Sequence, residues 1–178
     1  MKTMLFEVSM SRYSKLKSMF YESFDESRVT TLLSRLAPMS EQSRRGLDQF
    51  IGEGSHFQSF SASGLPLDLV VNVAKASFMK GGDVHIKRWC EAMTKARSIE
   101  SDTLIPPMVV VKHAGLVAVV MPKGQDVDRD AAKSVGPQLL ATAKALGGAG
   151  LVMDDYPQVR QALGVPFIID WSDLALAD

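Results

Sequence analysis

Aspartates that follow short apolar runs in the last third of the chain are the residues best suited to chemistry. Asp154 and Asp155 end one such run, and Asp170 ends the next. We expect both runs to be strands joined by a short helix at residues 157–163, which would make a βαβ crossover. Parallel neighbours end at one edge of a sheet about 4.8 Å apart, so these aspartates should meet there.

The ligand chemistry of this aspartate group favours Mg²⁺ or Mn²⁺, because zinc prefers sulfur and imidazole. Asp126, Asp128 and Asp130 follow an earlier strand and could add a third carboxylate. A metal held in this way activates water and neutralises a phosphoryl group, as in a metal-dependent nuclease or phosphodiesterase. The competing interpretation is structural, because aspartates after strands also cap helices and make turns.

The run GLVMDDYPQVRQALGVPFII, residues 150–169, is similar to the last βαβ unit of PIN-like nucleases. In that family an aspartate after a strand precedes a helix and a Leu-Gly-Val-Pro-like return. The resemblance implies that Asp154 or Asp155 is one metal-site carboxylate and that residues 126–130 lie near a second. The opening strand of the family normally carries an aspartate, and the nearest acid here is Glu7.

A Gly/Ser-rich segment at residues 52–64 (GEGSHFQSFSASG) holds His56, Phe57 and Phe60. We interpret it as a loop, and no Gly-Lys-Ser/Thr run follows that would make it a phosphate loop. The aromatic residues could bind a protein partner, since loops often carry binding residues. The alternative is that they pack inward and fix the loop.

A helix expected to begin at Asp83 has one basic face, which could contact the phosphates of a nucleic acid. That face carries Lys87, Arg88, Lys95 and Arg97. Glu91 interrupts it, which favours an ordinary solvated surface.

The first 103 residues are expected to be mainly helical. Apolar stripes predict helices at residues 13–20, from Asp25 to Pro38 and from Ser40 to Gly52. A further helix is predicted at residues 66–80, although its valines keep a strand open as the alternative.

From Pro106 onward, β-branched runs replace the helical stripes. Two runs at residues 108–111 and 116–121 flank a short glycine-containing connection, which predicts a β-hairpin. After Asp126, Asp128 and Asp130 we expect a helix whose apolar side runs from Ala132 to Leu146; at Pro137 either this helix kinks or a second helix begins. With the strands described above, the order of elements after Pro106 becomes β-β-α-β-α-β.

The composition of the chain limits the classes of function that we expect. The chain of 178 residues has twenty basic and twenty acidic side chains, a balance that argues against an unspecialised nucleic-acid binder. Its single cysteine, Cys90, cannot form an intramolecular disulfide, which suits a reducing compartment. Neither a secretion signal nor an apolar run of about 18 residues is present, so we expect a soluble cytoplasmic protein without a membrane segment.

The sequence thus predicts an α/β or α+β protein in which a helical region, residues 1–103, packs on a small α/β unit, residues 104–178. Together they should form one compact domain. Without a strong catalytic or cofactor motif, the leading hypothesis is a regulatory protein that binds a protein partner and needs no cofactor. The alternative is the Mg²⁺- or Mn²⁺-dependent nuclease, so the sequence leaves open whether the protein is an enzyme.

Overall fold

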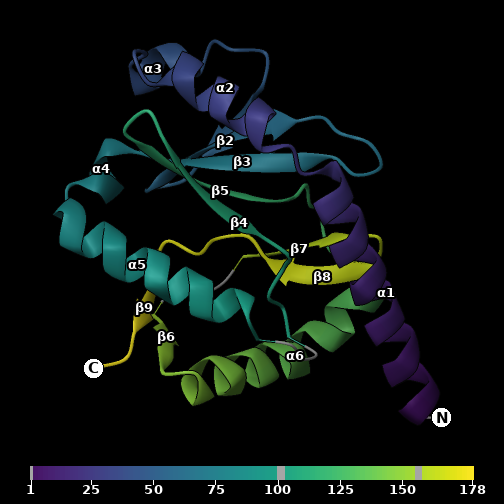
Figure 1. Ribbon diagram of the computed structural model, residues 1–178. Coiled ribbons are helices and arrows are strands. Elements are labelled where there is room, and N and C mark those ends of the chain that lie inside the picture. The colour runs from purple at the N-terminus through teal and green to yellow at the C-terminus, as the bar shows by residue number, and fades with distance from the viewer. Residues whose placement is uncertain (1, 100–102, 155–157) are drawn as a thin grey trace. The chain divides into compact units, whose positions relative to one another are not determined.

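The computed structural model describes residues 2–99, 103–154 and 158–178, which fall into two compact units (Figure 1). The sheet unit comprises Phe20–Ile86 and Met108–Lys123, and the α6 unit comprises Met1–Met19, Lys87–Pro107 and Gly124–Asp178. Helices are combined with an antiparallel sheet, so the mixed α and β class expected from the sequence is confirmed as α+β. The division predicted near residue 103 stays a prediction.

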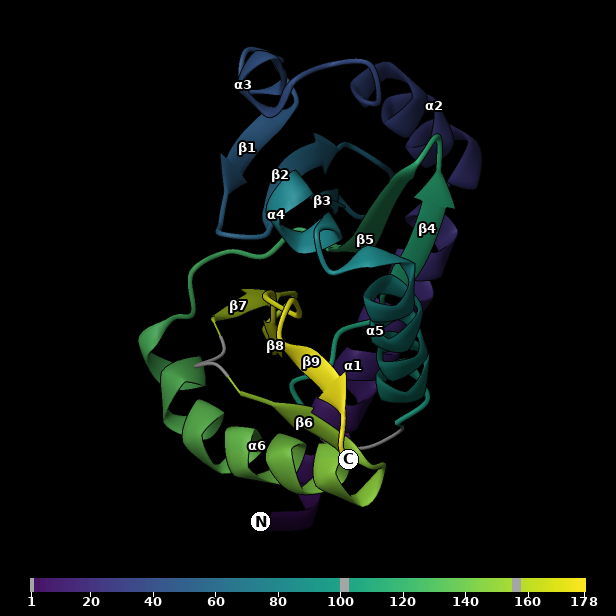
Figure 2. The ribbon, with the colours of Figure 1, turned by 90° about the vertical axis from the view of Figure 1, so that its left-hand side faces the viewer.

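A five-stranded antiparallel sheet forms the centre of the sheet unit (Figure 2). Its strands lie in the order β1 (Phe50–Glu53), β2 (Phe57–Ala62), β3 (Leu69–Ala74), β5 (Leu116–Pro122) and β4 (Val109–His113). Burial alternates along β2 and β3, because successive side chains of a strand point to opposite faces. Phe60, Val71 and Val73 are fully buried and supply part of the core.

Two tight hairpins have the same turn chemistry. Ala114 and Gly115 join β4 to β5 with φ angles of 51° and 75°. Leu163 and Gly164, with φ angles of 51° and 72°, join β7 (Val159–Ala162) to β8 (Val165–Ile168). Positive φ at both central residues is the type I′ pattern, whose twist matches that of the flanking strands. The hairpin predicted after Pro106 is therefore confirmed.

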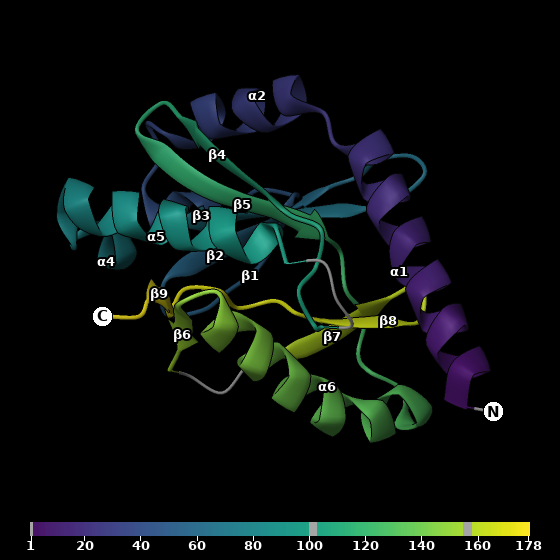
Figure 3. The same cartoon turned by 60° about the horizontal axis from the view of Figure 1, so that its bottom comes forward.

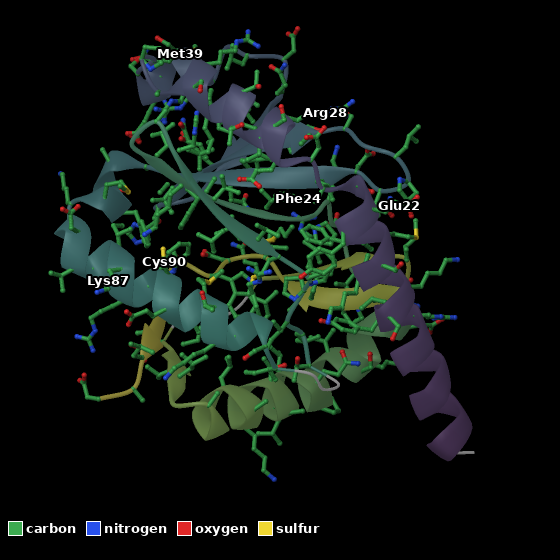
Figure 4. The ribbon with its side chains drawn as sticks, viewed as in Figure 1. Glu22, Phe24, Arg28, Met39, Lys87 and Cys90 are labelled. Carbon is green, nitrogen blue, oxygen red and sulfur yellow. The ribbon has the colours of Figure 1, made fainter. Side chains whose placement is uncertain are left out.

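Helix α2, Glu26–Leu36, contacts the β4 edge of the sheet through its apolar stripe. Asp25 caps it by accepting a hydrogen bond from the backbone N–H of Arg28, which Figure 4 marks on the first turn. Ser34 Oγ lies 2.7 Å from His113 Nε2 in β4. This helix and its cap were both predicted from the sequence. The short helices α3 (Glu41–Arg44) and α4 (Ala76–Met79) and the start of α5 (Gly82–Arg97) complete the sheet unit.

The α6 unit contains α6 (Arg129–Gly148), most of α1 (Lys2–Ser23) and two small antiparallel sheets. β6 (Leu151–Met153) pairs with β9 (Leu174–Leu176), and β7 pairs with β8. Helix α6 contacts β6 and β8 (Figure 3). The helix expected after the aspartates is confirmed, and it is one helix with Pro137 inside it rather than two. None of the described helices is long and apolar enough to cross a membrane.

Three predicted helices are wrong. The segment from Ser40 to Gly52 forms α3 and then β1, and residues 66–80 form β3 followed by α4. The part of the expected helix 157–163 that the structure describes contains β7 instead. Each of these segments is short, and its few apolar residues do not distinguish a helix from a strand by their periodicity. Pairing with strands that are distant in the sequence decides the outcome.

The predicted parallel crossover near the C-terminus is also wrong. β6 and β8 lie in different two-stranded sheets, and each pairs antiparallel with another strand. The Leu-Gly-Val-Pro run is the turn of the β7–β8 hairpin rather than a return from a helix. The geometric reason for placing Asp154 beside Asp170 is therefore lost.

Candidate functional site

The β1–β2 hairpin carries two glycines that its own fold does not require. Neither Gly52 nor Gly54 has a positive φ, and a Cβ built on either would meet nothing within 4 Å. The backbone at both positions is thus open to close approach by another group, a common use of glycine at ligand sites. The connection itself is tight, because the Gly54 N–H donates to the Phe57 carbonyl at 2.9 Å.

Backbone donors at the tip of this hairpin are also open. Among the described residues, neither Ser55 nor His56 donates its N–H to a backbone carbonyl. Successive N–H groups in a turn can form a concave site for an anion. The hairpin tip therefore has open space beside its two glycines and backbone N–H groups that are available to an anion.

Lys75 follows β3 and reaches back to the hairpin. Its backbone N–H donates to the His56 carbonyl at 2.8 Å, which fixes the lysine beside the hairpin tip. Its Nζ donates to the Gly54 carbonyl at 3.2 Å and lies 3.4 Å from Glu53 Oε2. Only 17% of the Lys75 side chain is exposed, so the ammonium is held in place by the fold.

Glu53 is the centre of a charged network in the sheet unit. Arg45 contacts Glu53 Oε1 through Nε at 2.7 Å and Nη2 at 2.6 Å, while Lys75 and Gln58 Nε2 (3.2 Å) contact Oε2. Partial desolvation alone would raise the pKa of the Glu53 carboxyl, but the hydrogen bonds from Arg45, Gln58 and Lys75 bring that pKa below its ordinary value. Glu53 is therefore an anion at neutral pH.

Gln58 holds this network against α3. It is fully buried, and its Nε2 also donates to the Glu41 carbonyl at 2.9 Å. Both contacts need a donor, which fixes the orientation of the amide. Within the described residues its Oε1 has no hydrogen-bond partner, so a buried acceptor is left unsatisfied.

The aromatic residues predicted to bind a partner separate into two groups. Phe60 is fully buried and packs on Phe50, with ring centroids 5.8 Å apart. His56 and Phe57 are half-buried, and their rings lie 6.2 and 5.0 Å from the ring of Phe78 in α4. Phe60 thus belongs to the core, and a partner contact at His56 and Phe57 stays a prediction.

The predicted metal ligands have separate local roles where the structure describes them. Asp126 pairs with Arg160, and Asp170 Oδ1 accepts hydrogen bonds from the Ser172 N–H and Oγ at 3.1 and 2.8 Å. Asp154 is exposed after β6, and Asp155 lies outside the described residues. Among the side chains that the structure describes, at residues 12–99, 103–154 and 158–178, no three His, Cys, Asp or Glu gather in a way that could hold a metal ion.

Asp128 shows the structural role that the sequence left open for these acids. It caps α6 by accepting hydrogen bonds from the backbone N–H groups of Ala131 and Asp130 at 2.8 and 3.1 Å. The bond from Ala131, followed by one from the Gln161 amide, lowers the pKa of the Asp128 carboxyl.

The basic face predicted on α5 is present and exposed. Lys87, Arg88, Lys95 and Arg97 all lie at the surface, and Figure 4 labels Lys87 on this helix. Arg88 Nη2 lies 3.5 Å from Asp178 Oδ1, so one of the four cations already has an acidic neighbour. Nucleic-acid binding by this face stays a prediction.

The sequence reasoning missed the residues that the sheet unit brings together, namely Arg45, Glu53, Gln58 and Lys75. A signal was available in the Gly-x-Gly of residues 52–54, followed about twenty residues later by a β-branched run that ends in lysine. This signal is hidden when the run is interpreted as a helix and the glycines as a connector.

Comparison with known proteins identifies the fold. No family model and no curated protein sequence match the chain. A solved structure described as "Structure of vaccinia related kinase 3" matches with a TM-score of 0.51 and 12% identity, over 72% of this chain and 47% of that chain. The chain has a kinase-like fold. It spans about half the length of that kinase structure. The structure of the BubR1 kinase domain also matches, with a TM-score of 0.44 and 11% identity, over 86% of this chain and 61% of that chain.

Proposed function

We propose that this chain is a regulatory protein that binds the phosphate groups of a nucleotide such as ATP at the β1–β2 hairpin. The observation that carries the proposal is the position of Lys75, whose ammonium lies against Gly54 at the tip of a glycine-containing hairpin. A fixed cation, open backbone donors and room beside two glycines form a set suited to a phosphate.

The pattern of protein kinases supports this interpretation. In those enzymes a G-x-G-x-x-G loop covers the phosphates of ATP, and a lysine on strand β3 pairs with the α- and β-phosphates. Gly52 and Gly54 match the first two glycines, and Phe57 stands in place of the third. Lys75 directly follows β3 and takes the position of the lysine.

The catalytic part of the kinase pattern is only partly present, which favours binding over phosphoryl transfer. Asp154 follows β6 and Asp170 follows β8, in the order of the two acids of that pattern. An asparagine that holds Mg²⁺ is expected five residues after the first acid. Val159 occupies that position and has no side-chain oxygen. The metal-dependent nuclease is not proposed, because its parallel strand pair is absent.

The test is nucleotide-dependent stabilisation of the full chain. At an ATP concentration of about 100 times Kd, binding adds about 2.7 kcal/mol, which raises the Tm of a domain of this size by roughly 5–10 °C. Lys75→Met should abolish the shift. Lys80→Met removes an exposed lysine of the same unit and should retain it. Absence of a shift in the wild type, or an equal shift in Lys75→Met, would contradict the proposal.

A further inference from the structure

The cations of the candidate phosphate site are already occupied by a carboxylate of the protein. Glu53 contacts Lys75 with one oxygen and Arg45 with the other. It also belongs to the hairpin, between the two glycines that leave the backbone open. The residue that would lie closest to a bound phosphate is therefore an acid.

We propose that Glu53 is an internal competitor of the nucleotide, an inference that rests on the function proposed above. A phosphate that takes the donors of Arg45, Gln58 and Lys75 competes with the Glu53 carboxylate for them, and the two anions repel each other at that distance. Nucleotide binding and the contacts of Glu53 therefore oppose each other. The contacts of Glu53 raise the apparent Kd for the nucleotide, because only the fraction of molecules in which they are broken offers all the donors.

The position that Glu53 vacates suits one phosphate group. Lys75 supplies an ammonium, Arg45 supplies a guanidinium, and the buried Gln58 supplies an amide N–H that now donates to Glu53. Guanidinium groups bind phosphate and carboxylate oxygens with the same two-donor geometry. A phosphate in this position would thus accept hydrogen bonds from the same three groups that now hold the carboxylate. Arg45 would then contribute to the affinity for phosphate in addition to Lys75.

The network that holds the Glu53 carboxylate leaves one hydrogen-bond acceptor unsatisfied, which lowers the free-energy cost of breaking the network. Gln58 Oε1 is buried without a donor among the described residues while its amide holds Glu53. A partly satisfied buried network gives up much of the stability that a complete one provides. The Glu53 and Arg45 side chains also remain 23% and 48% exposed, so solvent weakens their attraction.

The experiment compares equilibrium binding of ATP to wild type and Glu53→Gln by titration calorimetry. Ion pairs of this exposure contribute up to about 1 kcal/mol, so removal of the competing charge should tighten binding by roughly threefold to fivefold. Asp48→Asn removes an exposed carboxylate elsewhere in the sheet unit and should leave the affinity within about twofold. In a Lys75→Met background, Glu53→Gln should give no gain.

The outcomes separate this inference from the proposed function. If the wild type binds ATP through Lys75 and Glu53→Gln binds it no more tightly, the competitor inference is overturned and the proposed function stands. If neither protein binds ATP, both fail. Glu53→Ala serves as a second variant should the glutamine protein not fold, and the same gain is expected from it.

Discussion

At the scale of single residues, packing requires glycine at some positions of this chain and leaves space for a side chain at others. A Cβ on Gly124 would lie 2.4 Å from Arg160 Cβ and 3.3 Å from Phe167 Cζ, whereas Gly52 and Gly54 face open space. The first glycine is required by the folded structure. The other two leave the backbone accessible, as the proposed phosphate site requires.

Alanine substitutions should separate these two classes. Gly124→Ala forces atoms apart and should lower the free energy of unfolding by about 1–3 kcal/mol. Gly52→Ala and Gly54→Ala should leave stability nearly unchanged and weaken ATP binding about fivefold, the equivalent of one lost hydrogen bond. Urea denaturation and calorimetric titration of the three variants measure both quantities. Loss of stability in the hairpin variants, with unchanged affinity, would show that the fold itself needs their glycines.

Arg45, Glu53, Gln58 and Lys75 could not have been assembled from the sequence. Thirty positions separate Arg45 from Lys75, and neither lies in a motif that identifies a partner. Their meeting depends on the pairing of β1, β2 and β3, which places the end of β3 beside the hairpin tip. Only the two glycines and the lysine at the end of an apolar run were visible signals.

At the scale of elements, the sequence predicted those whose stabilising contacts are local. Helices α2, α5 and α6 carry long stripes or clear caps, and the β4–β5 hairpin is closed by a two-residue turn. β1, β3 and β7 are short, and their partner strands rather than their own periodicity decide their conformation. The antiparallel pairing of β6 with β9 joins residues more than twenty positions apart and had no local signal.

Substitution of Asp128 and Asp154 tests whether acids that follow strands cap helices. Asp128→Ala removes two backbone hydrogen bonds at the start of α6 and should lower the free energy of unfolding by about 0.5–2 kcal/mol. Asp154→Ala removes an exposed carboxylate and should change it by less than about 0.5 kcal/mol. Chemical denaturation at pH 7 gives both values. Equal losses would contradict the assignment of Asp128 as the cap on which α6 depends.

At the scale of the whole molecule, this chain is similar in fold to a kinase structure with which it shares 12% identity. The fold alone does not assign an activity, because sites and not folds perform chemistry. What connects this chain to phosphate binding is the set of contacts within the sheet unit, from Lys75 to Gly54 and Glu53. Val159 has no side-chain oxygen that could hold Mg²⁺, which agrees with the proposal of nucleotide binding without phosphoryl transfer.

The most direct measurement is the map of backbone amide chemical shifts when MgATP is added to the ¹⁵N-labelled chain of 19.4 kDa. The largest changes should fall on Ser55 and His56 at the hairpin tip and on Lys75, whose backbone N–H donates to the His56 carbonyl. They should saturate with ATP concentration and disappear in Lys75→Met. A spectrum that does not respond to millimolar MgATP, or changes confined to the basic face of α5, would contradict a nucleotide site at the hairpin.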